Sequence, residues 1–281
     1  MPASERLDET HFRSIADLIE RQVGIQLPPV KRTMVEGRLR KRVRALDLDG
    51  LDTYARLLFE EGHLKQELTH LIDCVTTNKT DFFREAEHFT FLREAAVPRL
   101  LARARRPTHL KVWSAAASIG AEAYTIAMVL DDIAREIQGF AYSILGTDVS
   151  TEVLKVAARG IYGLDMLAAV PPPFRRRYVM EARDAQRREG RIVPELRRRV
   201  RFRHMNLMDT RYPVDQDVDI IFCRNVLIYF DKPTQRMVVE HLARHLQPGG
   251  YLILGHSETM AGVGAAGLTQ ISSSIFQRAG A

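Results

Sequence analysis

The polar stretch Thr76–Arg84, TTNKTDFFR, carries the side chains best suited to bind a small ligand. Its hydroxyl and amide groups can hydrogen-bond a polar molecule, and Arg84 presents a planar guanidinium that pairs well with a carboxylate. The two phenylalanines before Arg84 would anchor the stretch in a hydrophobic core. The alternative is a helix N-cap at Thr80 or Asp81, which would leave Arg84 on the surface.

Two further candidates each follow an apolar strand. Asp148 ends the predicted strand Tyr142–Thr147, about 25–30 positions past a small-residue turn, where a carboxylate can accept hydrogen bonds from both hydroxyls of a ribose. Asp148 could also cap a helix predicted at Ser150–Ala158, and the two roles are compatible. His256 follows the predicted strand Tyr251–Gly255 and could serve as a general base, although a single histidine in such a place is more often structural.

These side chains require a scaffold, and the segment Leu110–Leu130 indicates which one. It begins as an apolar run, breaks at Ser118–Gly120 and continues with helical spacing. A strand, a small-residue turn and a helix open a doubly wound α/β domain, in which a ligand binds at the turn. The full GxGxxG fingerprint is absent, so the turn alone leaves the ligand open. An apolar strand at Val218–Cys223, a helix at Pro233–Leu246 and a closing antiparallel strand within Leu268–Arg278 continue this domain.

The first part of the chain has a different pattern. Apolar residues at helical spacing predict four helices, at 11–24, Val30–Leu46, 53–60 and 64–75, which would form a small all-α domain. On the second helix Lys31, Arg38 and Arg42 fall on one line. This line is either a solvated basic face or a surface that docks an acidic helical partner.

Residues 170–204 interrupt the α/β alternation. Three short β-like runs, Arg177–Glu181, Arg191–Leu196 and Arg199–His204, follow a run of prolines. They predict a small antiparallel β-subdomain inserted in the larger domain.

The 281-residue chain is long enough for two folded units, and its 46% hydrophobic and 27% charged residues are typical of a globular protein. No apolar run reaches the roughly 18 residues of a membrane span, so we expect no membrane insertion. Cys74 and Cys223 lie in apolar segments and are predicted to be reduced thiols of a cytoplasmic protein. The net charge of +6 suits either nucleic acid or an acidic protein surface.

Six motifs in order give the chain a resemblance to one family. They are TTNKTDFFRE, SAAASIGAE, GTDVS, NLMD, FCRNVLIYFD and LGHSE, preceded by the helical segment. Together they resemble the chemotaxis receptor methyltransferases (CheR), which methylate glutamate side chains of bacterial chemoreceptors with S-adenosylmethionine. The turn Ser118–Tyr124 departs from the family's usual S-T-G-E-E-P-Y, but it keeps the second acidic position as Glu122.

The resemblance implies a class I, Rossmann-like methyltransferase sheet with a small β-subdomain, preceded by an all-α domain. It divides the chain into a helical domain at 1–76, a linker at 77–90 that contributes to the cofactor pocket, and a methyltransferase domain at 91–281, with the β-subdomain at about 172–204. It implies S-adenosylmethionine as cofactor and S-adenosylhomocysteine as product. We expect no metal ion, and a monomer is the default expectation because the sequence does not reveal the oligomeric state. The nine residues that would bind the cofactor are Asn78, Thr80, Arg84, Glu122, Asp148, Asn206, Leu207, Arg224 and Asn225.

The resemblance also assigns roles to individual residues. Arg84 would lie near the cofactor's carboxylate and the methyl-transfer region, and Tyr229 would lie beside the reactive methyl group, so these two are the catalytic candidates. Lys31, Arg38 and Arg42 would face the cytoplasmic helical region of a chemoreceptor. One alternative is a non-catalytic module that only senses S-adenosylmethionine. Another, a nucleic-acid methyltransferase, would need an acidic-Pro-Pro-aromatic loop where this chain has CRNVLIYF.

Overall fold

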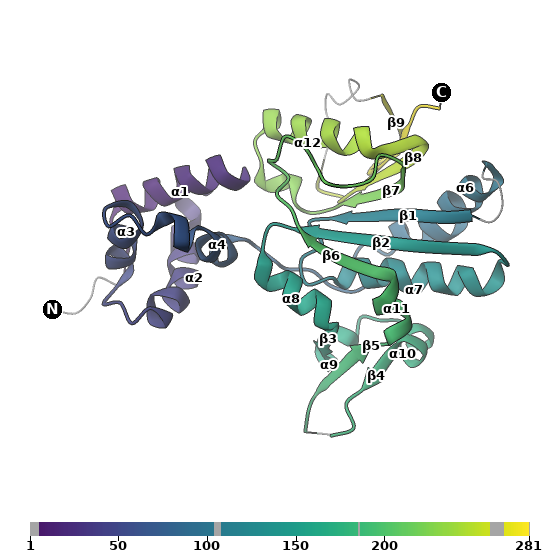
Figure 1. Cartoon of the computed structure of the whole chain (residues 1–281), viewed down its shortest axis with the longest axis horizontal. Helices are drawn as coiled ribbons and strands as arrows, with labels where there is room; N and C mark the ends of the chain where they lie inside the picture. The colour runs from purple at the N-terminus through teal and green to yellow at the C-terminus, as the bar shows by residue number, and fades with distance from the viewer. Residues whose placement is uncertain (1–5, 104–107, 185, 259–266, 281) are drawn as a thin grey trace.

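The computed structural model describes residues 6–103, 108–184, 186–258 and 267–280. The N-terminal domain is helical, and Figure 1 shows it as a lobe beside the larger α/β domain. The segments with apolar residues at helical spacing form the predicted helices. These are α1 (Glu9–Val23), η1 (Pro29–Lys31), α2 (Arg32–Ala45), α3 (Leu51–Phe59) and α4 (Leu64–Val75). Asp8 caps the start of α1, and Gly24 ends this helix in the left-handed conformation that glycine adopts without strain. The second helix, predicted at Val30–Leu46, is confirmed as α2, and the 3₁₀ turn η1 takes the place of its first residues.

The linker after α4 has no helix until α5 (Glu87–Phe91). The alternative that a helix begins at Thr80 or Asp81 is therefore wrong. Phe82 is buried in the core of the α/β domain, and its partly buried neighbour Phe83 packs against the same core, so the predicted anchoring is confirmed. Burial of these rings fixes where the polar residues before them lie.

The main sheet has seven strands in the order β6-β2-β1-β7-β8-β10-β9. Five of them are parallel, and the last two form a hairpin that pairs antiparallel with β8. The predicted closing strand is therefore confirmed as two strands rather than one. The strands are β1 (Thr108–Ala115), β2 (Phe140–Asp148), β6 (Val200–His204), β7 (Val218–Cys223), β8 (Leu246–Leu254), β9 (Leu268–Ser272) and β10 (Ile275–Arg278).

Both faces of this sheet are buried, because helices cover each of them, and successive residues of a strand point to opposite faces. On β1, Val112 packs into the core beneath α7 (Ala121–Glu136), whereas Trp113 packs into the core beneath α12 (Lys232–His245). Figure 1 shows α7 and α12 on opposite sides of the strands. Apolar runs without polar alternation are thus the expected pattern for these central strands. Outside the inserted subdomain, this domain also contains η2 (Leu92–Ala96), α6 (Val97–Arg103), α8 (Thr151–Arg159) and η3 (Leu227–Tyr229).

The inserted β-subdomain exists, but its predicted boundaries were wrong. Its three-stranded antiparallel sheet has the order β3-β5-β4, and its elements run from residue 161 to 199. They are β3 (Ile161–Gly163), α9 (Leu164–Leu167), α10 (Pro172–Tyr178), β4 (Val179–Glu181), β5 (Glu189–Ile192) and α11 (Pro194–Arg199).

The prediction that the run Arg199–His204 belongs to this subdomain is wrong, because its strand β6 lies in the main sheet and pairs parallel with β2. The reason is a contact between strands. Phe202 of β6 covers Gly146 of β2 so closely that a Cβ atom at Gly146 would lie 2.6 Å from the ring. A glycine in the neighbouring strand thus makes room for the aromatic side chain that seats β6 at the sheet edge.

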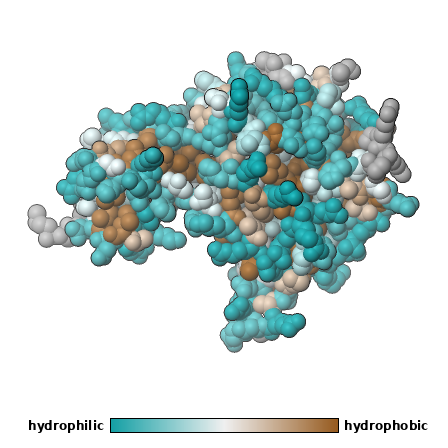
Figure 2. Space-filling view, viewed as in Figure 1, coloured by the Kyte–Doolittle hydropathy of each residue, from teal (hydrophilic) through white to brown (hydrophobic). Residues whose placement is uncertain are grey.

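Most of the face seen in Figure 2 is hydrophilic, with apolar residues visible on the N-terminal lobe and in the middle of the larger domain. Within the described residues, no helix is both long and apolar enough to span a membrane. Cys74 and Cys223 are both free thiols, as predicted.

A partly buried ion pair joins α2 to α4 in the N-terminal domain. The Arg42 guanidinium donates to both carboxylate oxygens of Glu67, at 2.8 and 2.5 Å, and the Tyr54 hydroxyl donates to the same carboxylate at 3.3 Å. The hydrogen bonds from Arg42 lower the pKa of Glu67, although burial opposes this shift. The pair therefore stabilises the fold fully above pH 4.5, the ordinary pKa of the glutamate, and this contribution is lost as the pH falls through the lowered pKa.

We predict that Glu67→Gln lowers the free energy of unfolding by about 2 kcal/mol at pH 7, because Arg42 loses its counter-charge in a partly buried site. The urea-unfolding transition measured by circular dichroism tests this. Glu61→Gln, on the exposed turn before α4, is the matched control and should leave the midpoint unchanged. Equal loss in the two variants, or a Glu67→Gln deficit that persists unchanged at pH 3, would contradict this role.

Candidate functional site

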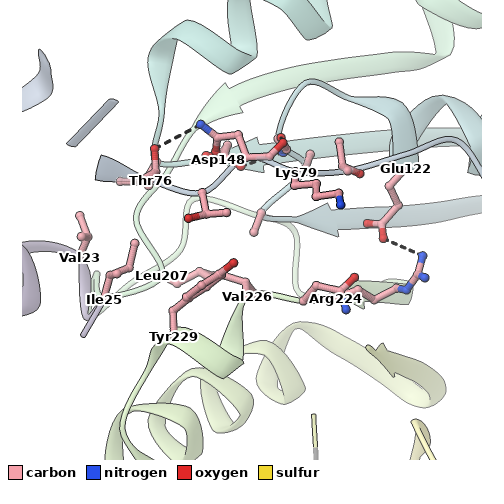
Figure 3. Close-up of a pocket in the computed structure, with 18 of the residues that line it drawn as sticks. Val23, Ile25, Thr76, Lys79, Glu122, Asp148, Leu207, Arg224, Val226 and Tyr229 are labelled. Atoms are coloured by element: carbon pink, nitrogen blue, oxygen red, sulfur yellow. Dashed lines mark hydrogen bonds and ion pairs between the residues drawn. The ribbon is translucent and has the colours of Figure 1, made fainter. Parts of the chain in front are cut away.

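The order of the parallel strands fixes where a ligand can bind. From β1 the chain continues outward to β2 and β6, whereas β7 and β8 extend the sheet on the other side of β1. The connections after β1 and β7 therefore leave in opposite directions and open a crevice at the carboxyl ends of these strands. An open cavity of about 920 Å³ lies there (Figure 3).

All ten residues predicted to bind the cofactor or act in catalysis line this cavity. They come from five separate segments: the linker, the start of α7, the end of β2, the loop after β6 and the loop after β7. The residues are Asn78, Thr80, Arg84, Glu122, Asp148, Asn206, Leu207, Arg224, Asn225 and Tyr229.

Sequence reasoning missed the part of the wall that comes from the N-terminal domain. Val23 and Ile25, at the end of α1, face the cavity from the side of Leu207 and Tyr229 (Figure 3). The backbone N–H of Gln26 donates to the carbonyl oxygen of Tyr229 at 2.9 Å and so joins the two domains at this wall. In the sequence these residues look like the ordinary end of an amphipathic helix, so no local signal marks them.

Asp148 lies at the carboxyl end of β2 and is almost fully buried. One carboxylate oxygen accepts the backbone N–H of Ser118 at 2.8 Å, and the other accepts that of Ser150 at 2.9 Å. Burial raises the pKa of Asp148, although these two hydrogen bonds oppose the shift. Each oxygen keeps a lone pair for a further donor. The helix α8 is capped by the Ser150 side chain, so the prediction that Asp148 caps it was wrong.

Glu122 begins α7 just after the turn and is buried against two partners. It accepts a hydrogen bond from the Ser114 hydroxyl at 2.6 Å and an ion-pair hydrogen bond from Arg224 at 3.1 Å. Burial raises the pKa of Glu122, and the charge of Arg224 opposes this shift. Figure 3 shows the Glu122–Arg224 pair at the opposite end of the cavity from Val23 and Ile25.

Arg224 connects three parts of the site. Besides Glu122, its guanidinium pairs with Glu85 at 3.0 Å and donates to the carbonyl oxygen of Arg84. Glu85 also accepts the side-chain amide of Asn225 at 3.1 Å. Burial raises the pKa of Glu85, but the hydrogen bond from Asn225 and the charge of Arg224 together outweigh it and hold this pKa below its ordinary value. Sequence reasoning did not single out Glu85, although it ends the TTNKTDFFRE motif.

A second residue that sequence reasoning missed is Glu258, which ends the LGHSE motif. Its buried carboxylate accepts four backbone N–H groups, those of Asn225, Val226, Leu227 and Gly255, at 2.6 to 2.9 Å. Burial raises its pKa, and the four hydrogen bonds oppose the shift. Asn225 has a left-handed backbone with φ 59°, so this carboxylate holds a strained loop at the cavity wall.

The three basic residues predicted to bind the partner make different contacts within the structure. The Lys31 ammonium lies 5.0 Å from the centre of the Tyr229 ring, beside the cavity. Arg38 instead donates to the carbonyl oxygens of Val75 and Thr76 at 2.6 and 3.1 Å, and Arg42 is paired with Glu67. His256, considered as a general base, does not line the cavity.

A doubly wound sheet closed by an antiparallel hairpin, with a polar cavity at its switch point, defines a class I methyltransferase. Comparison of the sequence with models of protein families identifies the family within this class. Residues 78–274 match the SAM-binding domain of the CheR methyltransferases, and residues 10–76 match the all-alpha domain of the same family. The chain belongs to the CheR methyltransferase family. It is an S-adenosylmethionine-dependent enzyme, which decides against the non-catalytic alternative.

Relatives of known function are similar over most of their length. The chemotaxis protein methyltransferase of Salmonella typhimurium is 41% identical, over 91% of this chain and 85% of the relative. That of Escherichia coli is 40% identical, over 91% and 86%, and chemotaxis protein methyltransferase 2 of Pseudomonas aeruginosa is 37% identical, over 88% and 85%.

We predict that Glu258→Gln weakens binding of S-adenosylhomocysteine at least tenfold. An amide carbonyl cannot accept four N–H groups spread over two carboxylate oxygens, and its NH₂ group would face donors, so the loop Asn225–Leu227 would leave its strained position. Calorimetric titration measures the affinity. Glu94→Gln, an exposed glutamate of η2, is the control and should bind like the wild type. Unchanged affinity in the Glu258 variant would show that the loop does not shape the pocket.

Proposed function

We propose that this protein methylates glutamate side chains of chemoreceptors in the cytoplasm, forming glutamate methyl esters that serve chemotactic adaptation. The observation that carries the proposal is the single cavity lined by all ten predicted residues, drawn from five segments of a CheR-family chain. We further propose that the enzyme acts as a monomer and on protein rather than on nucleic acid.

The apolar, polar and charged parts of the cavity wall follow the same order as the parts of S-adenosylmethionine. Val23, Ile25 and Leu207 give an apolar end that fits a purine ring, and the Glu122–Arg224 pair gives a charged end that fits an amino acid (Figure 3). Asp148 lies at the end of β2, with lone pairs left to accept two ribose hydroxyls. In this proposal Asn78 and Thr80 add polar contacts from the linker, and Asn206 lies beside the purine.

The chain needs to supply little acid–base chemistry. When bound, S-adenosylmethionine would supply an electrophilic sulfonium methyl group; the substrate carboxylate would take this group to form an ester as the S–CH₃ bond breaks and S-adenosylhomocysteine leaves. A glutamate with a pKa of about 4.3 is already ionised at neutral pH, so no general base is required. The residues of this chain instead align the acceptor and exclude water. We assign alignment to Arg84, whose planar guanidinium matches a carboxylate, and the shape of the methyl end to Tyr229.

The acceptor would reach the cavity where the two domains meet. Lys31 lies against Tyr229 there, and its positive charge would attract a receptor segment that carries glutamates. Arg38 and Arg42 support this surface from within, because Arg38 holds the carbonyl oxygens at the start of the linker and Arg42 holds Glu67. The proposed receptor-facing role therefore rests on Lys31 directly and on the two arginines through the position of α2.

We predict that Asp148→Ala weakens the binding of S-adenosylhomocysteine more than tenfold, about 1.4 kcal/mol or more, because the proposed ribose contacts are lost. Calorimetric titration of wild type and variant measures this. Asp184→Ala, an exposed carboxylate of the β-subdomain, is the control and should retain wild-type affinity. No binding by well-folded wild-type protein would overturn the proposed pocket itself.

We predict that Arg84→Ala and Tyr229→Phe each lower methyl transfer at least tenfold, about 1.4 kcal/mol in the barrier, with little change in thermal stability. The assay follows a radioactive methyl group from S-adenosylmethionine into base-labile esters on a chemoreceptor fragment. A receptor fragment with its candidate glutamates changed to alanine is the control and should remain unlabelled. Wild-type turnover in either variant would remove that residue from the catalytic assignment.

A further inference from the structure

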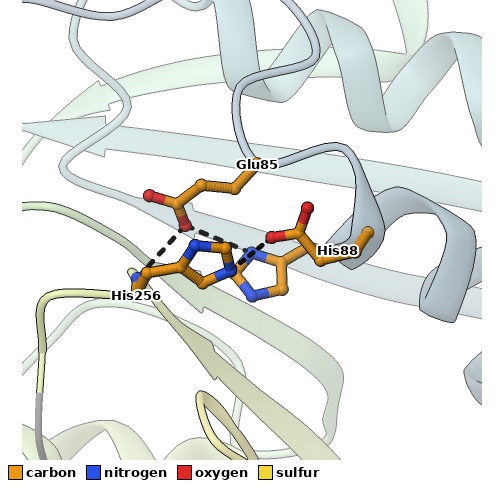
Figure 4. A group of neighbouring side chains, drawn as sticks. Glu85, His88 and His256 are labelled. Atoms are coloured by element: carbon orange, nitrogen blue, oxygen red, sulfur yellow. Dashed lines mark hydrogen bonds and ion pairs between the residues drawn. The ribbon is translucent and has the colours of Figure 1, made fainter.

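A second group of chemically reactive side chains lies next to the cofactor pocket, behind Arg224. Glu85, Glu87 and His88 come from the end of the linker and the start of α5, and His256 comes from the loop after β8. One ligand atom from each of the four lies within 4.8 Å of the others. Figure 4 shows the side chains of Glu85, His88 and His256 converging from these separate parts of the fold. In the part of the chain that the structure describes, this is the one such group of histidines and carboxylates.

An independent observation points to a missing partner in this group. His88 is 1% exposed, and its Nδ1 atom is buried without a hydrogen-bond partner. Its Nε2 atom is 2.7 Å from the Ser274 hydroxyl. When Nε2–H donates to that hydroxyl, the Nδ1 lone pair points toward Glu85, whose carboxylate oxygen is 3.5 Å away. An orienting hydrogen bond on one ring nitrogen and a free lone pair on the other is the usual arrangement of a metal-bound histidine.

We propose that Glu85, Glu87, His88 and His256 form a binding site for a divalent transition-metal ion, with Zn²⁺ as the best fit. Two imidazoles and two carboxylates are ligands typical of Zn²⁺, whereas Mg²⁺ and Ca²⁺ favour oxygen ligands alone. This inference does not depend on the proposed substrate of the enzyme.

Two of the four proposed ligands are held by the surrounding structure, and the other two are exposed. Glu85 and His88 are held in place, Glu85 by Arg224 and Asn225 and His88 by its burial. The side chains of Glu87 and His256 are 57% and 50% exposed, and they already contact each other. Tetrahedral zinc with bonds of about 2.0–2.1 Å brings its ligand atoms to about 3.4 Å from one another. The Glu85 oxygen and His88 Nδ1 are already 3.5 Å apart, and rotation of the two exposed side chains would bring the remaining ligand atoms to a similar spacing.

The local charge also favours a cation. Arg224 is the positive group in contact with Glu85, and its charge is shared with Glu122. Glu85, Glu87 and Glu122 together outnumber this one arginine, so the cluster keeps negative charge for a divalent ion. The ion would join the linker to His256 in the loop after β8. His256 is two residues before Glu258, so the ion would stabilise the wall of the cofactor pocket on its outer side.

Titration of metal-free, chelator-treated protein with ZnCl₂ tests the proposal directly. We expect one ion per chain by calorimetry, a rise in thermal stability, and affinity that is unaffected by excess MgCl₂. His256→Gln and Glu87→Gln alter exposed side chains and should leave the fold intact, yet each should weaken Zn²⁺ binding more than tenfold. Substitution with Co²⁺ should give the intense visible absorption of a four-coordinate site in the wild type and lose it in both variants.

His70→Gln, which changes an exposed histidine of α4, is the matched control and should bind Zn²⁺ as the wild type does. Absence of Zn²⁺ binding in the wild type would overturn the proposal. Equal affinity in the wild type, His256→Gln and Glu87→Gln would overturn it as well, since the ion would then bind elsewhere. None of these measurements requires methyl transfer, so a negative result for the metal site would leave the proposed function unaffected.

Discussion

The buried guanidinium of Arg224 is the interaction on which the site depends. A charge in this position is costly unless it is paired, and Glu85 and Glu122 together supply the negative charge. These partners come from the linker and from α7, whereas Arg224 follows β7. The ion pairs of this one arginine thus connect three segments that are far apart in the sequence, at the carboxyl edge of the sheet.

The pocket wall is made of backbone in costly conformations, which buried carboxylates hold in place. Left-handed residues other than glycine cluster here, at Phe83, Glu85, Ala116, Ser118 and Asn225, and Asp47 is the further described example. Asp148 accepts the N–H of Ser118, and Glu258 accepts that of Asn225. Each carboxylate offsets the strain of the loop that it binds and so holds the ligand-binding surface in place.

The N-terminal domain is part of the pocket rather than an appendage. Gly24 lets α1 end close against Phe230, and the backbone of Gln26 then reaches Tyr229. Val23 and Ile25 are thereby placed in the cavity wall. A receptor that docks on this domain would therefore meet the cofactor site across a short, already ordered contact, which links the choice of substrate to the alignment of its carboxylate.

The sequence by itself determined the elements and most of the site. Apolar runs and helical spacing are local properties, and motif residues such as Asp148 at a strand end have positions that the fold class dictates. Only the tertiary structure decided the positions of residues whose partners are distant in the sequence. Strand β6 joins the main sheet because Phe202 fits over Gly146, and Arg42 turns inward because Glu67 lies opposite. Such contacts are set by packing between segments, and no local pattern in either segment records the other.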